Sequence, residues 1–384
     1  MDDRRLAARL ENMAGWFAAS LLTTIMVIYA FELNQDTARP EARCLNPSPA
    51  QEPLALQMAR AAERGRGRQA TAPVHIPWQG WKDILVRTYY DIQNHRVLAL
   101  AAGVVFYSLL SLFPAIAAGV SFYALFSDAG TIAKHLSLAA DIVPSTVLDM
   151  FRDEIMRIAS KSDGKLTLGF FLGLGVALWT ANSGMKAMFD ALNIIYQEQE
   201  KRGIVRLNLV SLLFTVCAIT AALLVLGAVV VFPLLLAAFD LSTSDRPVIG
   251  FLRWPLMFVL LILGLAVLYR YGPSRRHAKW RWISIGSVFA ALAWLAVSWI
   301  FSWYLGNFAN YNATYGALGA VVGLMMWMWL CTVVIHVGAV LNSEIEHQTA
   351  RDSTIGPPKP LGARGAVMAD TVGVAQTSIH SVPG

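Results

Sequence analysis

One ionisable side chain and a few hydroxyl and amide groups interrupt long apolar segments of the chain, and these are the residues that could do chemistry. His336 is the ionisable one, inside the apolar run from Tyr315 to Leu341. An imidazole in such surroundings is a candidate proton relay or ligand contact. The alternative is a neutral histidine hydrogen-bonded to a neighbouring helix, and residue type alone favours this alternative.

Tyr107 and Ser111 are four residues apart, so they share one face of a helix, and Pro114 follows them. A proline kink lined by hydroxyls would suit a gate in a transport path. Hydroxyls also join helices to one another in membranes, and this second explanation is the simpler one.

Amide and hydroxyl groups at the ends of two apolar runs also have two alternative roles each. Thr180 and Asn182 would line a polar cavity, or would belong to the start of a following helix, for which Ser183 is the favoured cap. Asn342 would bond across helices or mark the membrane exit. We take Tyr107, Ser111, Thr180, Asn182, His336 and Asn342 as the candidate polar path or cavity.

No catalytic arrangement accompanies these residues. Aspartate and glutamate are absent from the apolar runs, the seven histidines are scattered, and Cys44, Cys217 and Cys331 have no metal-ligand spacing. A nuclease needs such groups to activate water, and no phosphate-binding G-x-x-x-x-G-K-[ST] loop is present. We therefore expect no catalytic residues, no metal and no cofactor, and the protein not to be an enzyme.

The elements that must position the candidates are membrane helices. The chain is 56% hydrophobic and 15% charged, against about 25% charged residues in soluble domains. Apart from Arg253, every Lys, Arg, Asp and Glu lies outside six apolar runs, each about long enough to cross a membrane as a helix. The predicted fold is an all-α six-helix transmembrane bundle, with runs at 98–126, 166–183, 207–239, 251–269, 282–306 and 315–341.

Basic residues predict which ends of the bundle face the cytoplasm. Lys and Arg gather in 78–97, 184–206 and 270–281, so these segments and the C-terminus are expected inside the cell. Their role in setting topology also explains the net charge of +6 without nucleic acid. Within the last run, Gly319 and Gly323 have the G-x-x-x-G spacing that lets helices approach closely.

The segment after the second run predicts an amphipathic helix on the cytoplasmic membrane surface. Met185, Met188, Leu192 and Ile195 share one face, and polar residues occupy the other. The chain is expected to leave the membrane near Ser183. The residues assigned to this surface helix are Lys186, Asp190, Asn193, Tyr196 and Arg202.

The two ends of the chain differ from the bundle in composition. Residues 1–31 hold a basic arm and an apolar segment at 14–31, which predicts an additional N-terminal transmembrane helix. Residues 32–77 contain six prolines and the run RGRGR at 64–68, and predict a flexible, solvated linker. The tail at 351–384 is expected to be disordered.

Four stretches together resemble a known family. They are AAGVVFYSLLSLFPAI (101–116), LWTANSGMKAMFDALNIIYQEQEKRG (178–203), YRYGPSRRHAKWRW (269–282) and YGALGAVVGLMMWMWLCTVVIHVGAVLNSEI (315–345). Their order and spacing over 78–350 are similar to those of the YihY/BrkB family of bacterial inner-membrane proteins. The resemblance implies a six-helix bundle in the inner membrane with cytoplasmic ends. Where that family often reads G-A-E-L-N, this chain has Val340 in place of the glutamate.

Functional expectations follow from this resemblance and from the residues together. Members have carried the name ribonuclease BN, held to be a misassignment; others are linked to serum resistance or to export of lipid or lipopolysaccharide precursors. We expect a transporter or exporter of a lipid or amphipathic envelope precursor. The alternative is a non-transporting scaffold for envelope assembly or serum resistance. Membrane lipids, such a precursor and a second copy of the chain are the expected partners, and nucleic acid is not.

Overall fold

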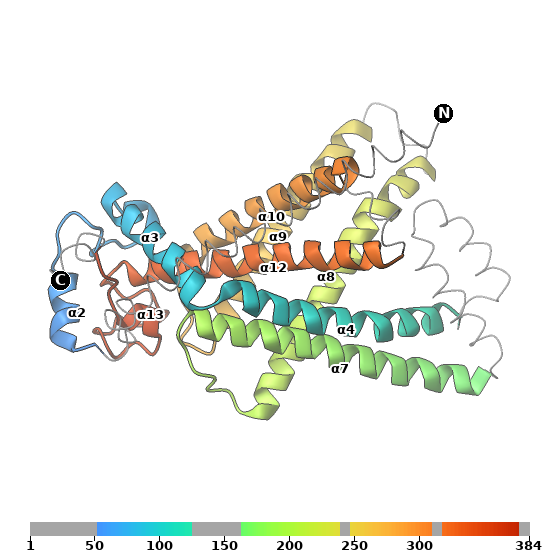
Figure 1. Cartoon of the computed structure of the whole chain (residues 1–384), viewed down its shortest axis with the longest axis horizontal. Coiled ribbons are helices and arrows are strands. Elements are labelled where there is room, and N and C mark those ends of the chain that lie inside the picture. Colours follow the sequence, from blue (N-terminus) through green and yellow to red (C-terminus); the bar gives the residue numbers. More distant parts are fainter. Residues whose placement is uncertain (1–51, 125–162, 239–245, 309–316, 376–384) are drawn as a thin grey trace, which may run out of the picture. The chain divides into compact units, whose positions relative to one another are not determined.

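The computed structural model describes residues 52–124, 163–238, 246–308 and 317–375, and those from Leu54 onward belong to one compact unit. Within these ranges the chain is helical, and Ala278 and Thr354 form an isolated β-bridge (Figure 1). The elements are α2 (Leu54–Ala61), η2 (Pro73–His75), α3 (Trp78–Asn94), α4 (Val97–Ala124), α7 (Asp163–Ile195), α8 (Ile204–Ala238), α9 (Arg246–Tyr271), α10 (Trp280–Phe308), α12 (Ala317–His347) and α13 (Val367–Asp370).

Six long helices, α4, α7, α8, α9, α10 and α12, match the six predicted apolar runs. Three stretches are long and apolar enough to cross a membrane: Ile204–Ala222, Trp280–Asn307 and Val321–His347. Val97–Ser111 and Pro255–Tyr271 are shorter apolar stretches of the same kind. The predicted all-α membrane fold is confirmed, while the predicted helix at 14–31 lies outside the described residues.

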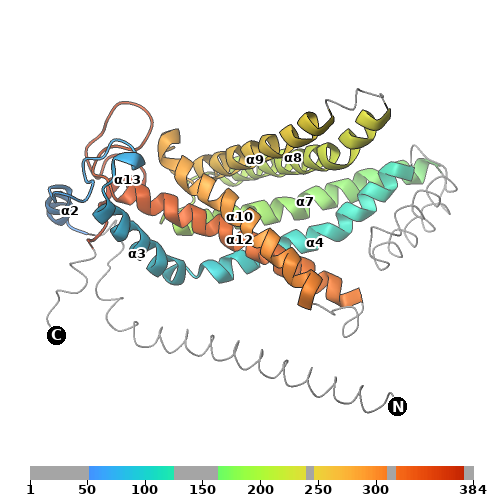
Figure 2. The same ribbon diagram turned by 90° about the horizontal axis from the view of Figure 1, so that it is seen from above.

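Helix α12 is the element against which most others pack. It contacts α3, α4, α7, α10 and α13, and α4 runs along α7 (Figure 2). The share of buried residues is 39% in Val321–His347 but 11% in Ile204–Ala222 of α8. The core is therefore built around α12, and α8 is peripheral to it.

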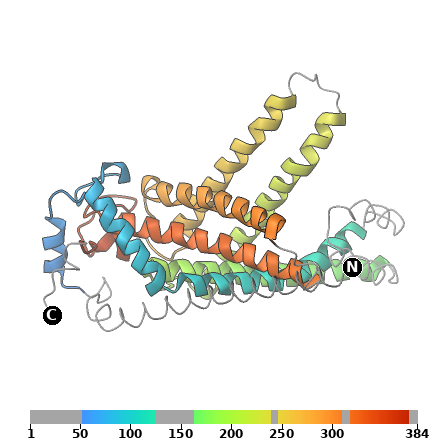
Figure 3. The same ribbon diagram turned by 45° about the horizontal axis from the view of Figure 1, so that its top comes forward.

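The close crossing of α10 and α12 depends on two glycines that sequence spacing did not single out (Figure 3). A Cβ at Gly286 would collide with the Gly338 carbonyl and the Asn342 side chain, whereas one at Gly323 would meet nothing within 4 Å. The predicted approach through Gly323 is thus wrong. Gly286 and Gly338 come from different helices, so a spacing rule within one helix does not find them.

Two segments predicted to lack structure are ordered against the bundle in their described parts, residues 52–77 and 351–375. In the predicted linker, α2 and η2 form, and Arg68 of the RGRGR run is buried. In the predicted disordered tail, Met368 and Val372 are each fully buried. Both corrections have the same cause: the segments satisfy their polar groups on each other and on α12, which composition alone does not reveal.

Candidate functional site

The surroundings of α12 bring three helices together through polar contacts. The Tyr269 hydroxyl of α9 donates to the Ile335 carbonyl at 2.7 Å. The Gly286 amide of α10 donates to the Asn342 Oδ1 atom at 2.8 Å. Asn342 is 1% exposed, so of its two expected roles the structure shows the bond across helices.

His336 and Asn182 are buried with unpaired polar atoms. His336 is fully buried and Asn182 is 4% exposed. Neither ring nitrogen of His336 has a hydrogen-bond partner, and neither does the Asn182 Oδ1 atom. The preferred interpretation, in which His336 is hydrogen-bonded to a neighbouring helix, is therefore wrong. An unmet buried polar group costs about 1–3 kcal/mol, so two such residues need a reason to persist.

The hydroxyl candidates bond within their own helices. The Ser111 hydroxyl donates to the Ser108 carbonyl at 2.7 Å, and that of Thr180 to the Val176 carbonyl at 2.9 Å. Ser183 donates to the Trp179 carbonyl at 3.2 Å, so it is not a helix cap. Among the described contacts, no hydrogen bond joins any two of the six predicted path residues, and Tyr107 is 40% exposed.

The first part of the predicted surface helix, residues 184–195, is instead the end of α7, which is continuous from Asp163 to Ile195, and residues 196–202 lie in the loop after it. Tyr196 is fully buried and Asn193 is 4% exposed, so neither lies on a free surface. The prediction is wrong at these two residues because the α9–α10 connection covers them, through Ser274 at Asn193 and Arg275 at Tyr196. Asp190 is exposed, as expected, and Lys186 donates to Asn208 Oδ1 of α8 at 3.1 Å.

The loop after α7 is held by a small polar network. Arg202 Nε and Nη2 each donate to the Glu200 carboxylate at 2.7 Å, and Asn193 Nδ2 donates to it at 3.0 Å. Burial opposes ionisation, but the hydrogen bonds from Arg202, Asn193 and Ser274 prevail and lower the pKa of Glu200 to about 2. The Ser274 amide donates to Asn193 Oδ1 at 2.7 Å, which ties this loop to the α9–α10 connection.

A buried ion pair lies beside that network. Arg275 donates to Glu346 of α12 at 2.5 Å, and the Arg275 guanidinium lies 4.2 Å above the Tyr196 ring. Burial raises the pKa of the Tyr196 phenol, so it stays neutral. Sequence reasoning missed this pair because Arg275 had been assigned to an inside-positive loop and Glu346 was not singled out.

The C-terminal segment, defined as residues 351–375, fastens the same end of the bundle. The Val367 amide donates to Glu198 Oε1 at 2.7 Å, and Arg68 Nη2 donates to the Gly373 carbonyl at 2.7 Å. The Val372 amide donates to Gln57 Oε1 at 2.6 Å. Segments from before α3, after α7 and after α12 thus share one polar assembly.

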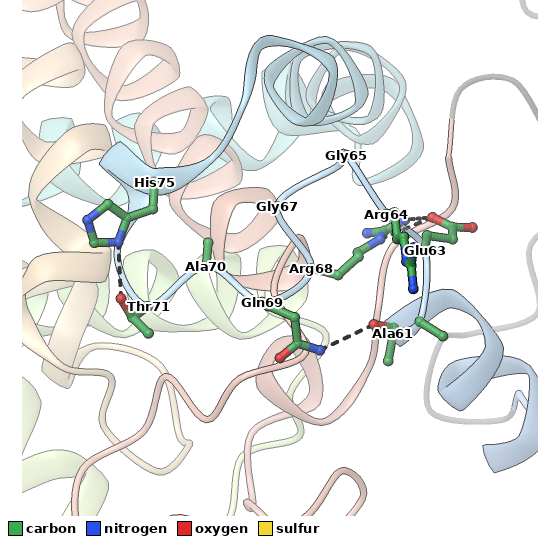
Figure 4. A pocket seen from close by; sticks show the side chains of 11 residues that line it. Ala61, Glu63, Arg64, Gly65, Gly67, Arg68, Gln69, Ala70, Thr71 and His75 are labelled. Atoms are coloured by element: carbon green, nitrogen blue, oxygen red, sulfur yellow. Dashed lines mark hydrogen bonds and ion pairs between the residues drawn. The ribbon is translucent and has the colours of Figure 1, made fainter.

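A pocket of about 490 Å³ lies in the loop that carries the RGRGR run, between Ala61 and His75 (Figure 4). Arg68 is bonded to Glu63 at 2.7 Å, and Arg66 to Asp83 at 2.7 and 2.8 Å. Two of the three arginines therefore serve as internal ties. Across the described ranges, no three His, Cys, Asp or Glu residues are grouped as metal ligands.

Comparison with known proteins agrees with this architecture. The model of the virulence factor BrkB family matches residues 88–361. YfkH of Bacillus subtilis, named as a ribonuclease-like protein, is 29% identical over 265 residues, covering 65% of this chain and 90% of the relative. The UPF0761 membrane protein IL2447 of Idiomarina loihiensis is 32% identical over 257 residues, covering 64% of this chain and 84% of the relative.

A UPF0761 membrane protein of Verminephrobacter eiseniae is 27% identical over 251 residues, and the match spans 57% of that longer relative. No solved structure matches the chain with significance. The family match covers well over half of the chain and includes α4, α7, α8, α9, α10 and α12. This chain is therefore a membrane protein of the virulence factor BrkB family.

Proposed function

We propose that the protein moves a lipid or an amphipathic envelope precursor across the bacterial inner membrane. The observation that carries this proposal is the exposure of α8. Ser211 and Thr215 are buried, but every residue from Val216 to Ala222 is exposed, on all sides of the helix. A helix sealed into a closed bundle would bury one face along this length.

An apolar helix open on every side admits lipid chains to the side that faces the bundle as well as to the side that faces away. Leu213 is 61% exposed and Leu224 is 66% exposed. On α9, which follows α8, Val259 is 58% exposed. Lipid tails would lie along these surfaces while a polar headgroup passes nearby, which suits an amphipathic cargo better than a small hydrophilic one.

Polar partners for such a headgroup would come from α7 and α12, which contact each other. His336 and Asn182 hold their unpaired atoms in the buried interior of these helices. An arriving hydroxyl group would donate to Asn182 Oδ1, and a hydroxyl or phosphate oxygen would accept from the ring N–H of His336. The basic end of the bundle, with the C-terminus, is proposed to face the cytoplasm. Nucleic acid is not a proposed partner, because Arg66, Arg68 and Arg202 are committed to internal bonds.

Lipid movement in reconstituted vesicles tests this proposal. Purified protein is placed in vesicles containing a headgroup-labelled fluorescent phospholipid, and a membrane-impermeant reductant bleaches the outer leaflet. Loss of inner-leaflet fluorescence beyond that of protein-free vesicles supports lipid movement. His336→Leu and Asn182→Leu should each slow it, and the exposed Asp190→Asn should not. Equal bleaching with and without protein would refute transport of this lipid class.

A scaffold for envelope assembly is the second candidate, favoured by the tight crossing at Gly286 and Gly338. In this role the exposed face of α8 would contact a second copy or another membrane protein instead of cargo. Chemical cross-linking of native membranes through a cysteine at Ala218 would then give a defined dimer. Dimer formation without any lipid movement would favour the scaffold.

A further inference from the structure

Helix α3 presents a stripe of aromatic and apolar side chains away from the rest of the protein. Trp78, Lys82, Leu85 and Tyr89 follow one another at steps of four, three and four residues, so they share one side of the helix. Trp78 is 67% exposed, Leu85 is 51% exposed and Tyr89 is 53% exposed. The Lys82 Nζ atom lies 5.9 Å from the centroid of the Trp78 ring. These four residues form the outer face of α3.

The opposite face of α3 holds ion-paired charges. Asp83 is buried and accepts two hydrogen bonds from Arg66 Nη1, at 2.8 and 2.7 Å. Arg87 Nε donates to Glu344 Oε2 of α12 at 2.5 Å, and Ile84 is fully buried on the same side. A surface helix in water turns its charged side chains outward and its apolar stripe inward. Helix α3 instead buries ion pairs and exposes an aromatic and apolar stripe, so its outer face is poorly suited to bulk water.

The end of α3 is fixed close to the start of a membrane helix. Only His95 and Arg96 separate α3 from α4, and Val97–Ala124 contains no Lys, Arg, Asp or Glu. Arg96 has a φ of 50°, outside the right-handed helical region, and the chain changes direction between the two helices (Figure 2). A helix that lies along a membrane surface needs such a bend before the chain crosses the bilayer.

Helix α3 does not have the composition of a further membrane span. It is 17 residues long and carries Lys82, Asp83, Arg87 and Asp91. Charged side chains at these positions would be costly in the hydrocarbon core. The headgroup layer suits the outer face better, because Trp and Tyr are enriched there and a lysine can bury its stem while its amine stays among polar groups.

We propose that α3 lies in the headgroup layer of the membrane, with its outer face inserted among the lipids. Helices of this kind bury their apolar face about 5–10 Å into the boundary between headgroups and acyl chains. Leu85 and the rings of Trp78 and Tyr89 contact that boundary, and the Lys82 amine pairs with lipid phosphates. The opposite face stays bound to α12 and to the loop before α3. This placement does not depend on whether the protein moves lipid.

Fluorescence quenching in nanodiscs of phosphatidylcholine and phosphatidylglycerol tests the placement. The full-length chain carries Cys44→Ser, Cys217→Ser and Cys331→Ala, and Leu85→Cys then receives a fluorescent label. The label should be quenched by lipids with a nitroxide near the headgroup, and less by lipids with a nitroxide at the end of the acyl chain. Its quenching by aqueous iodide should be several times weaker than that of a label at Lys359→Cys, an exposed position in the C-terminal segment.

Two outcomes of the quenching experiment would overturn the proposal. A label at Leu85→Cys that iodide quenches as strongly as the label at Lys359→Cys would place the outer face in water. A label that neither iodide nor the nitroxide lipids quench would mean that protein covers this face. A label quenched by the lipids and shielded from iodide supports the proposal.

A variant without any label gives an independent measurement. Leu85→Glu places a carboxylate in the outer face, so it should lower the melting temperature of the protein in nanodiscs. Gln79→Glu is the matched control, because Gln79 is an exposed residue of α3 that lies outside the stripe. In water, both substitutions would be tolerated equally. Equal melting temperatures for the two variants would therefore contradict contact between the outer face and lipid.

Discussion

Arg275 and Glu346 form an ion pair at 2.5 Å whose two side chains are only 1% and 2% exposed. Arg275 belongs to the α9–α10 connection and Glu346 to the end of α12. The Ser353 hydroxyl donates to the other oxygen of Glu346 at 2.5 Å. One buried carboxylate therefore anchors two helical regions and the C-terminal segment.

Removing one partner of this pair should be costly. Glu346→Gln leaves the buried Arg275 charge uncompensated, and we expect it to lower the free energy of unfolding by about 3–5 kcal/mol. Thermal unfolding in detergent, followed by tryptophan fluorescence, measures the change. The double variant Arg275→Met/Glu346→Met should lose less than the single one, because no lone charge remains. Single and double variants of equal stability would contradict the assignment.

Gly286→Ala should separate α10 from α12. Its Cβ would collide with a backbone carbonyl, which has little room to yield, so we expect a loss of about 1–3 kcal/mol. Gly264→Ala in α9 is the matched control, because its Cβ would meet nothing within 4 Å. Alanine favours a helix over glycine, so this control should be neutral or more stable. Equal changes in stability in both variants would show that the close crossing of α10 and α12 does not decide the effect.

The Glu200 network predicts a specific dependence on pH. Because the pKa of Glu200 is lowered to about 2 in the folded state, its stabilising effect is complete above the ordinary value for glutamate and is lost as pH falls through about 2. Glu200→Gln should cost about 1 kcal/mol at neutral pH. The difference from the wild type should shrink as the solution is acidified, in unfolding curves recorded along a pH series. A difference in stability between the two proteins that does not change with pH would mean that the negative charge of Glu200 does not cause it.

The C-terminal segment should be required for a stable bundle end. Deleting residues 351–384 removes the carbonyl partners of Arg68 and Arg87 at Gly373 and Val374, and it uncovers the protein surface that Met368 packs against. We expect a lower melting temperature and faster proteolysis before α3. Deleting residues 376–384 keeps all of these contacts and is the control. Equal melting temperatures for the two truncations would show that the contacts add nothing.

His336→Leu should distinguish the effect of the buried imidazole on stability from its role in lipid movement. It removes two unpaired buried nitrogen atoms, so stability should stay the same or rise by about 1 kcal/mol. Lipid movement should fall in the same variant. A variant that is less stable than the wild type would instead mean that the imidazole has a partner in the membrane.

Much of the fold was predictable because lipid imposes a simple rule on sequence. The separation of charge from six apolar runs gave the positions of α4, α7, α8, α9, α10 and α12 to within a few residues at most ends. The clearest exception is α7, which continues past Ser183 to Ile195. Helical periodicity showed that this part has two faces, but not that the α9–α10 connection would cover Asn193 and Tyr196.

The candidate site was predictable by residue type but not by position. His336 and Asn342 were both recognised as polar groups in or beside the last span, yet one is buried without a partner and the other bonds to α10. The rotation of a helix about its axis decides this difference. A helix that is apolar on nearly all sides carries too little amphipathic pattern to specify that rotation.

The sequence by itself determined that the chain is a helical membrane protein, where its spans lie and which family its motifs resemble. Only the tertiary structure decided that Arg275 meets Glu346, that Arg87 meets Glu344, and that the C-terminal segment folds back onto the loop before α3. The physical reason is the range of the interactions. Hydropathy acts along the chain, whereas ion pairs and hydrogen bonds join residues that are distant in sequence and close only after the helices pack.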